Sequence, residues 1–381
     1  MAGSSFGNHF QITTWGESHG TGIGVVIDGC PAGLSLCASD IQKFLNRRKP
    51  GQSKYTTPRK EDDKVEILSG VFEGRTTGTP VSLVVFNENQ RSRDYGDIAS
   101  CYRPGHADYT FDQKYGFRDY RGGGRSSGRE TIGRVAGGAV AVKILEQLGV
   151  SFLTYARAIG PVAIPQSAEE LLAASLADGG SSCTDLKEQI LANPLYMPDA
   201  GSSKTAQAYL EECMKRTDSA GGVIEGIITG VPAGIGEPVF DKLDACLAKA
   251  IFSIGAVKGF EIGDGFLAAS ASGSANNDSF RTQHGRITTA TNHAGGILGG
   301  ISSGMPVIYR AAVKPTPSIA FAQQTVRQDG EEITLSIHGR HDPVIVPRAV
   351  VVVESMAALT LLDLMLKNMG TRMDSLEQFY R

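Results

Sequence analysis

Short apolar segments that end in glycine-containing turns recur along the chain and predict β-strands. The clearest cover residues 10–15, 65–68, 82–86, 257–262 and 308–313. Because strands joined by short glycine turns run in opposite directions, the pattern predicts mostly antiparallel sheets. Strands and helices do not alternate over the whole length, which argues against a doubly wound α/β fold.

Four longer segments have the pattern of helices. Residues 39–48 and 241–253 each follow a predicted strand and turn. Residues 130–148 are rich in alanine, glycine and valine, which predicts close packing on another helix or sheet. Residues 349–367 are apolar on nearly all sides, which predicts a helix buried in the core.

Two stretches of sequence occur twice, in the same order, and indicate an internal repeat. Residues 26–34 read VIDGCPAGL and residues 227–235 read IITGVPAGI; TTGTPV at 76–81 matches SSGMPV at 302–307. The pattern is typical of an ancient duplication, whose halves usually form one compact body with a site between them. The alternative is coincidence, because turns of glycine and proline are common.

We expect one large domain over residues 1–370 with an internal pseudo-repeat. Its parts are halves at about 20–90 and 222–315, an insertion at 91–221 and, after the domain, a C-terminal tail at 371–381. Within the insertion, residues 165–221 hold Ser, Gly and Asp clusters around helical patches. We interpret this stretch as lying on the surface.

Composition narrows the class of protein. The 381 residues include 47 glycines without a Gly-X-Y period, and the net charge is −3. These values indicate a folded chain with no global attraction to nucleic acid or membranes. We expect neither a signal peptide nor a transmembrane segment. Six scattered cysteines without a CxxC pair indicate reduced thiols in the cytoplasm, and neither a disulfide framework nor a zinc site.

The loop Gly16–Gly20 (GESHG) contains the first candidate for chemistry, His19. A histidine between small residues is sterically open, and its ordinary pKa of about 6.5 suits proton transfer. On these five residues alone, a surface histidine in a turn is the better interpretation. Glu17 and His19 can also bind a metal ion, but no third ligand is near in sequence.

A cationic stretch follows the first predicted helix. Seven cations and no acid occur between residues 43 and 60, namely Lys43, Arg47, Arg48, Lys49, Lys54, Arg59 and Lys60. A solvated helix face is the usual explanation for such a stretch. Because this one sits at a helix C-terminus and enters a Pro-Gly loop, it also predicts a local anion-binding surface.

Residues 103–108 (RPGHAD) and 120–129 (YRGGGRSSGR) precede the predicted helix at 130. A glycine-rich approach to a helix N-terminus is typical of phosphate binding. The segment is not a Walker A motif, so a nucleoside triphosphate is disfavoured. An RNA-binding RGG segment is also disfavoured, because such segments are long, repeated and disordered.

Three further segments contain candidate binding residues. Asn292–Gly304 contains glycines against which a planar group can lie, and Lys314–Ser318 (KPTPS) adds a cation and two hydroxyls on a rigid turn. His338-Gly-Arg-His-Asp-Pro343 reads better as an anion clamp with a base than as a metal site, because Gly and Pro disfavour a helix. Together the segments predict a small, multiply anionic ligand and a flat cofactor that carries a phosphate.

The segments together resemble the signature sequences of chorismate synthase. They are Gly16–Gly20, Arg103–Asp108, Asp119–Ser127, Val257–Phe266, Asn292–Gly300 and Gly339–Pro343. The resemblance runs in order from about residue 5 to 365. Each segment alone is moderately specific, and the ordered set is very specific.

The resemblance implies a lyase that converts 5-enolpyruvylshikimate 3-phosphate to chorismate and phosphate by 1,4-anti elimination, the last common step of the shikimate pathway. It implies reduced FMN as cofactor with no net redox change. It also implies an α+β fold, a layered β-α-β sandwich with helices between antiparallel sheets, assembled as a homotetramer. No metal, nucleic-acid or membrane partner is implied.

The resemblance also implies roles for individual residues. His19 protonates the leaving phosphate, His106 lies near flavin N1 and stabilises the reduced anion, and Asp342 is linked to proton removal through flavin N5. The implied flavin contacts are Arg125, Ser126, Ser127, Gly255, Ala256, Gly299, Lys314, Pro315, Thr316, Pro317, Ser318 and Arg340. The implied substrate contacts are Arg48, Lys54, Arg103, Arg129, Arg134 and again Arg340.

Two points depart from a simple transfer of the family's properties. Many relatives have Arg where this chain has Lys54, which keeps the charge but loses the bidentate fork. Some relatives also reduce their own flavin with NADPH; no dinucleotide fingerprint is present here, which favours the type without that activity. The alternatives are a flavin-dependent reductase of another anionic metabolite and a phosphate-sensing binding module.

Overall fold

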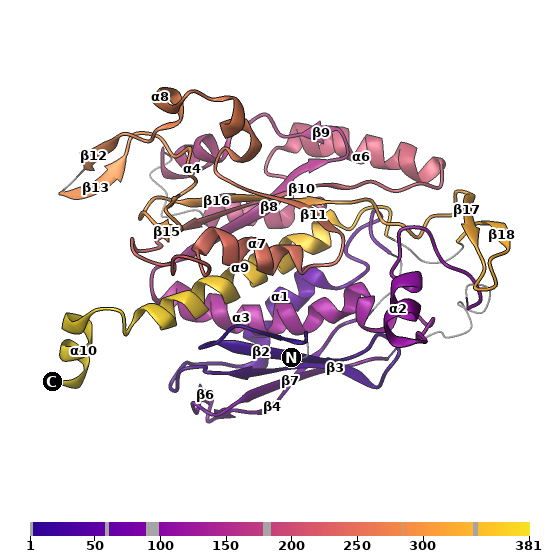
Figure 1. Cartoon of the computed structure of the whole chain (residues 1–381), viewed down its shortest axis with the longest axis horizontal. Coiled ribbons are helices and arrows are strands. Elements are labelled where there is room, and N and C mark those ends of the chain that lie inside the picture. Colours follow the sequence, from indigo (N-terminus) through magenta and orange to yellow (C-terminus); the bar gives the residue numbers. More distant parts are fainter. Residues whose placement is uncertain (1–2, 58–60, 89–98, 178–183, 284, 338–341) are drawn as a thin grey trace.

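The computed structural model describes residues 3–57, 61–88, 99–177, 184–283, 285–337 and 342–381. Two antiparallel sheets lie on either side of a layer of helices (Figure 1). In the described part of the chain each of these sheets has five strands. The arrangement confirms the expected α+β layered sandwich.

The first sheet has the spatial order β1-β2-β3-β7-β4. Its strands are β1 (Ser5–Phe6), β2 (Gln11–Gly16), β3 (Gly22–Asp28), β7 (Val81–Phe86) and β4 (Val65–Ser69). In β3 the alternate residues Ile23, Val25 and Ile27 are fully buried. The period of two turns these side chains toward the helix layer, where α3 contacts β3.

The second sheet has the order β11-β16-β10-β8-β9. Its strands are β11 (Val257–Ile262), β16 (Val307–Val313), β10 (Gly222–Thr229), β8 (Ser151–Ile159) and β9 (Val162–Ala163). Among the residues that the structure describes, four hairpins lie outside the two sheets. They pair β5 (Val71–Phe72) with β6 (Arg75–Thr76), β12 (Phe280–Gln283) with β13 (Arg286–Thr289), β14 (Ile297–Leu298) with β15 (Ile301–Ser302), and β17 (Gln323–Val326) with β18 (Glu332–Leu335).

The helix layer contains α1 (Ala38–Arg48), α3 (Thr131–Gln147), α7 (Leu243–Phe252) and α9 (Val346–Asn368). The small residues of α3 allow the close packing that the sequence predicted. A Cβ at Gly138 would lie 2.2 Å from the Cβ of Ser355 on α9. Helix α9 is long and apolar enough to cross a membrane, but 78% of its most apolar window is buried inside the protein. It is therefore a core helix, as expected.

The other helices lie outside this layer. They are α2 (Asp108–Tyr115), α4 (Ala168–Ala177), α5 (Thr184–Ala192), α6 (Ala200–Lys215), α8 (Gly273–Asn276) and α10 (Met373–Tyr380). The segment at 371–381 that we expected to be a tail thus carries an exposed helix, α10.

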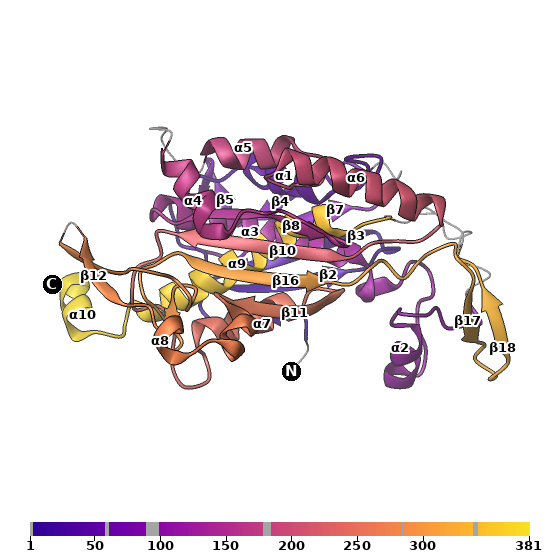
Figure 2. The same ribbon diagram turned by 90° about the horizontal axis from the view of Figure 1, so that it is seen from above.

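The prediction that residues 165–221 form a surface insertion was wrong for their inner side. Leu195, Met197 and Leu210 are buried and belong to the main hydrophobic core. The backbone of Tyr196 also accepts a hydrogen bond from the N–H of Ala156 in β8. Figure 2 shows α4, α5 and α6 along one side of the molecule. Composition failed here because the polar clusters lie between the apolar side chains that pack inward.

The two predicted halves have the same topology. Strand β3 pairs with β7 and β7 with β4, just as β10 pairs with β16 and β16 with β11. Helix α1 follows β3 and helix α7 follows β10. The outer pairs both contain a register shift, at Ile67/Ser69 and at Val257/Gly259. The shared topology fits a duplication, which stays an interpretation of how the fold arose.

Candidate active site

A large cavity lies at one end of the helix layer, where α3 and α9 begin and α1 and α7 end. Its volume is about 1090 Å³. Ligand pockets commonly measure about 300–1,000 Å³, so two small molecules can fit side by side. The N-termini of α3 and α9 direct unpaired backbone N–H groups and a partial positive charge toward this end, which favours anions.

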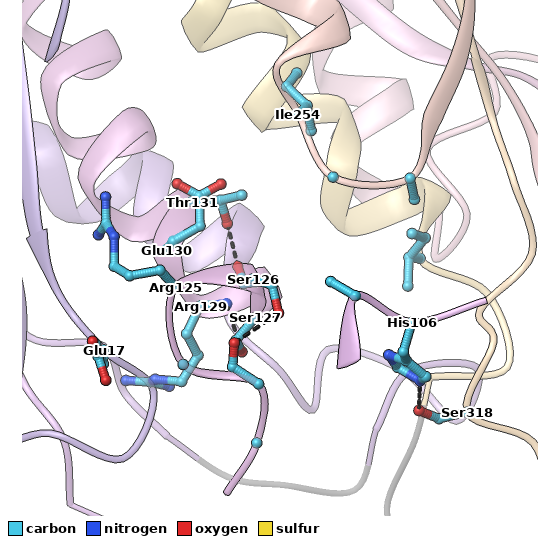
Figure 3. A pocket seen from close by; sticks show the side chains of 18 of the residues that line it. Glu17, His106, Arg125, Ser126, Ser127, Arg129, Glu130, Thr131, Ile254 and Ser318 are labelled. Carbon is cyan, nitrogen blue, oxygen red and sulfur yellow. Dashed lines mark hydrogen bonds between the residues drawn. The ribbon is translucent and has the colours of Figure 1, made fainter. Parts of the chain in front are cut away.

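The glycine-rich turn before α3 forms one wall of the cavity. It contains the short 3₁₀ helices η2 (Gly124–Ser126) and η3 (Gly128–Glu130). Gly122, Gly123 and Gly124 all have positive φ, the conformation that glycine adopts most readily. Figure 3 shows Arg125, Ser127 and Arg129 on this wall, opposite His106 and Ser318.

His19 lies directly behind this turn. A Cβ at Gly122 would come within 2.3 Å of its Cε1, so only glycine fits there. The Oγ of Ser18 is 3.2 Å from His19 Nδ1. Gly122 and Glu17 line the cavity, whereas His19 itself is not among its lining residues.

His106 lies on the opposite wall, where the 103–108 and 314–318 segments meet. Its Nε2 is 2.6 Å from the Oγ of Ser318. Lys314 Nζ donates to the backbone oxygen of Gly105 at 2.7 Å. Burial, together with nearby Lys258, lowers the pKa of Lys314. The structure thus brings together two segments that are over 200 residues apart in sequence.

Arg103 is buried and forms a two-pronged ion pair with Asp108. Its Nε and Nη2 donate to the two carboxylate oxygens at 2.8 and 2.7 Å. Burial acts to raise the pKa of Asp108, but the hydrogen bonds and charge of Arg103 outweigh it and lower that pKa. The pair fixes the start of α2 next to His106.

Arg48, at the end of α1, is 2% exposed and uses all of its nitrogens within the protein. It donates to Asp63 at 2.6 Å, to Thr131 Oγ1 at 3.1 Å and to Gly128 O at 3.1 Å. Burial lowers the pKa of Arg48 to about 10, against the opposite effect of Asp63. These contacts tie α1 to the start of α3.

Arg129 extends the same cluster toward the cavity. It contacts Glu61, lies 3.2 Å from Asp63 and donates to Asn87 Oδ1 at 3.1 Å. Its Nη2 is buried and has no hydrogen-bond partner among the described residues. Thr316 Oγ1 on the far wall is likewise buried without a partner in the described part of the chain. Two polar atoms of the cavity wall therefore have unused hydrogen-bonding capacity.

Arg134 and Arg125 connect the α3 end to its neighbours. Arg134 pairs with Glu130 at 2.9 Å and donates to Ser253 Oγ at 2.6 Å, beyond the end of α7. Arg125 donates to Thr14 Oγ1 at 2.7 Å and to Gly16 O at 3.1 Å. Both arginines line the cavity.

Asp342 lines the cavity next to the start of α9 and has both oxygens engaged. The backbone N–H of Thr57 donates to Oδ1 at 2.7 Å, and Arg348 Nη1 donates to Oδ2 at 2.6 Å. Arg348 Nε also donates to the backbone oxygen of Arg48 at 2.9 Å. The carboxylate is therefore oriented from two sides.

Most of the residues expected at the site line this cavity. They are Arg48, Arg103, His106, Arg125, Ser126, Ser127, Arg129, Arg134, Gly255, Ala256, Lys314, Thr316, Pro317, Ser318 and Asp342. Lys54, Gly299 and Pro315 are not among its lining residues, and Arg340 lies outside the described residues. Lys54 instead pairs with Glu211 of α6 at 2.7 Å. Gly299 lies beside Gly300, which accepts a hydrogen bond at the opposite end of α7.

The sequence analysis missed several polar residues of the site, chiefly Glu61, Asp63 and Arg348. Glu61 and Asp63 directly follow the cationic stretch, so their position was a usable signal for its ion-pair partners. Arg348 carried no such signal, because its spacing from Asp342 matters only once α9 begins between them. Within the described residues, no group of three or more His, Cys, Asp or Glu side chains could hold a metal ion.

Comparison with known proteins identifies the family. The family model described as chorismate synthase matches residues 10–366. Chorismate synthase of Agathobacter rectalis is 64% identical over 381 residues, which cover 100% of both chains. That of Methanocella arvoryzae is 53% identical over 368 residues, covering 96% of this chain and 95% of the relative.

A solved structure, "Crystal Structure of Chorismate Synthase", has a TM-score of 0.76 and 30% identity, and the match covers 98% of this chain and 96% of that one. The fold, the full-length match and the high identity lead to the same conclusion. This chain belongs to the chorismate synthase family and is a phosphate-eliminating lyase of the shikimate pathway.

Proposed function

We propose that the cavity converts 5-enolpyruvylshikimate 3-phosphate to chorismate and phosphate by 1,4-anti elimination, with reduced FMN as a cofactor that undergoes no net redox change. The observation that carries this proposal is the convergence of distant segments on one cavity. Arginines from three regions, His106 and Asp342 line it, and His19 lies just behind its glycine turn.

The residues present fit a flavin with a phosphate-bearing tail. Ala256, with a φ of +73°, and Gly255 form a bare backbone turn after α7, against which a flat ring can lie. The unpartnered hydroxyl of Thr316 lies in the same wall. With Arg125, Ser126, Ser127, Lys314, Pro317 and Ser318, these residues would hold the cofactor. When bound, reduced FMN supplies the electron density that lowers the barrier to C–O cleavage.

The substrate carries a phosphate and two carboxylates, which need cationic partners in a closed site. Arg129 is the best supported of the proposed contacts, because its Nη2 has no partner in the described part of the chain. Arg103 and Arg134 line the same cavity. Arg48 supports the site mainly by fixing the start of α3, and Lys54 and Arg340 stay expectations from the resemblance.

Three groups are proposed to manage protons. His19 donates to the leaving phosphate from behind the glycine turn, because an imidazole, whose ordinary pKa is about 6.5, suits proton transfer near neutral pH. His106 stabilises negative charge on the cofactor side, held by its contact with Ser318 Oγ. Asp342 accepts the proton that leaves the substrate, and Thr57 and Arg348 orient its carboxylate.

The decisive experiment is anaerobic incubation with 5-enolpyruvylshikimate 3-phosphate and chemically reduced FMN, in which phosphate and chorismate are measured. Equal amounts of both products, with the flavin still reduced at the end, would support the proposal. Stoichiometric oxidation of the flavin would indicate a reductase, and ligand binding without products would indicate a binding module. Repeating the assay with oxidised FMN and NADPH tests for flavin reductase activity, which we do not expect.

We also propose a cytoplasmic homotetramer. Helix α8, the β12–β13 hairpin and α10 lie at one end of the molecule (Figure 1). Several large exposed apolar side chains belong to these elements or to the turn before α8. They include Phe266, Phe280, Ile287, Phe379 and Tyr380. Such a surface is typical of contacts between subunits. Light scattering after gel filtration measures the assembly, and a monomer would contradict this part of the proposal.

A further inference from the structure

The loop at residues 50–57, which follows α1, is exposed at Gly51, Gln52 and Lys54 but buried over its last three residues. Tyr55, Thr56 and Thr57 are between 1% and 5% exposed. The two ends of this 50–57 loop, Pro50 and Thr57, line the cavity. Its middle turns away from the cavity, toward the 165–221 segment.

Two contacts with the 165–221 segment hold the outer side of the 50–57 loop. The hydroxyl of Tyr196 donates to Gln52 Oε1 at 2.9 Å, and Gln52 Nε2 in turn donates to the backbone oxygens of Arg47 and Lys49 at 2.6 and 2.8 Å. The start of the loop is thereby tied both to the end of α1 and to the segment outside it.

The second contact is made by Tyr55 and helix α6. The Tyr55 hydroxyl lies 3.2 Å from Oε1 of both Gln207 and Glu211, each of which can accept its hydrogen. Tyr55 is 1% exposed, so its side of this hydrogen bond is shielded from water, whereas the side chain of Glu211 is half exposed. The neighbouring Lys54–Glu211 ion pair is exposed and contributes little.

The inner side of the same loop contacts the proposed proton acceptor. Thr57 is two residues from Tyr55, and its backbone N–H donates to Asp342 Oδ1 at 2.7 Å. Only Thr56, which is 5% exposed, separates the two residues, so we expect a displacement of Tyr55 to be transmitted to Thr57. Helix α6, the loop and Asp342 thus form one continuous series of contacts.

We propose that the 165–221 segment is a positioning element of the active site, which acts through Tyr55 and the Thr57 amide to orient Asp342. Neither α6 nor Tyr55 contacts the cavity, so the effect is indirect. The proposal rests on the proposed function only in taking Asp342 as the proton acceptor. The contact between α6 and the loop can be tested without any turnover.

The first test is Tyr55→Phe, which removes the hydroxyl and keeps the ring. One buried hydrogen bond is worth a factor of about 2–10 in an equilibrium. We therefore expect kcat to fall by about 2–10-fold, with KM for the substrate changed less than twofold. Hydrogen exchange at the Thr57 amide, followed by mass spectrometry of the 50–57 peptide, should speed up by a similar factor.

Variants of α6 separate positioning from a general loss of stability. The double variant Gln207→Leu with Glu211→Leu removes both acceptors and should reproduce the effect of Tyr55→Phe. Glu211→Gln breaks the Lys54 ion pair but keeps an acceptor, and should retain wild-type kcat and exchange. Lys215→Met is the matched control, because Lys215 pairs with Glu212 on the outside of the same helix.

Unchanged Thr57 exchange in Tyr55→Phe would overturn the proposal. So would a rise in KM at constant kcat, which would make the loop a substrate contact, or equal losses in Tyr55→Phe and Lys215→Met. If the wild-type protein releases no phosphate, the proposed function fails. The exchange measurements would then still decide whether α6 holds the loop against Asp342.

Discussion

Helices α1 and α7 occupy equivalent positions in the two halves of the molecule, yet their ends bring different chemistry to the cavity. The last turn of α1 carries Arg47 and Arg48, which bind buried carboxylates. Beyond α7, the chain continues as Ser253-Ile-Gly-Ala256, which has no charged side chain. One half offers fixed cations where the other offers bare backbone.

The difference shows how a repeated architecture can build an asymmetric site. A helix C-terminus carries a partial negative charge, which cations near it offset. At α1 the helix supplies its own arginines. At α7 the offset comes from Arg134 of α3, which donates to the backbone oxygen of Ser253 at 3.1 Å. The α7 turn thus has no charged side chain of its own, and the backbone of Gly255 and Ala256 is open for a flat ring. We therefore expect anion binding beside α1 and ring binding beside α7.

The largest expected effect comes from the first half. His19→Ala should reduce turnover by roughly 10²–10⁴-fold, the range for loss of a general acid, with little change in FMN affinity. Stopped-flow or steady-state release of phosphate measures turnover, and fluorescence titration measures FMN affinity. His293→Ala is the control, since this histidine pairs with Asp264 outside the cavity lining. Equal activity of His19→Ala and wild type would remove the role proposed for His19.

The next effect tests the charged helix end itself. Arg48→Ala leaves Asp63 buried with Arg129 as its remaining ion-pair partner, and breaking a buried pair costs about 3–5 kcal/mol. We expect the free energy of unfolding to fall toward the lower end of that range, as measured by urea denaturation. The dissociation constant for substrate should rise more than that for FMN.

Arg48→Lys is the matched variant, because it keeps the charge beside Asp63 and loses the contacts with Thr131 and Gly128. If Arg48→Lys recovers most of the stability but still binds substrate weakly, the loss of substrate affinity is due to the lost contacts at the start of α3. A larger loss of FMN affinity than of substrate affinity would contradict the assignment of substrate to the α1 end and of the flavin ring to the α7 end.

Periodicity predicted the regular elements of both halves well. The strand expected at 257–262 is β11 to the residue, and the helix expected at 130–148 is α3 within one residue at each end. These elements are buried on a regular pattern, so burial and sequence carry the same signal. Helix α5 and the packing of the 165–221 segment were missed, because their apolar residues are few and separated by polar clusters.

The site was harder to predict than the fold. Motifs and resemblance identified the loops that meet at the cavity, but not how their charges are paired. The cationic stretch looked like a free anion-binding surface, whereas Arg48 is buried on Asp63 and Lys54 turns to α6. Ion pairs between residues far apart in sequence depend on three-dimensional packing, which no local pattern encodes.

Two variants of Ala256, in the turn after α7, should change the free energy of unfolding by smaller amounts and in opposite directions. Ala256 has a φ of +73°, where a side chain costs about 1–2 kcal/mol and a β-branched one costs more. Because Ala256 already bears that cost through its own Cβ, Ala256→Val should lower the free energy of unfolding only by the extra cost of β-branching, and should weaken FMN binding. Ala256→Gly should raise the free energy of unfolding by up to ~1 kcal/mol, because glycine adopts this conformation readily. Thermal and urea unfolding check both, and equal stability of the two variants would contradict the argument.

The smallest expected effect is that of salt on ligand affinity, which tests, without any substitution, whether anions bind beside α1 and the ring beside α7. Added salt shortens the screening length from about 10 Å at 0.1 M to about 3 Å at 1 M, which weakens attraction between separated charges. The substrate has a phosphate and two carboxylates, whereas oxidised FMN, the form titrated, has one phosphate on an uncharged ring. Substrate affinity should therefore fall several-fold over this range and FMN affinity less, as calorimetric titration at each salt concentration can measure. Equal salt dependence of the two ligands would mean that both bind chiefly through the arginines, and that the α7 turn adds no separate site for the ring.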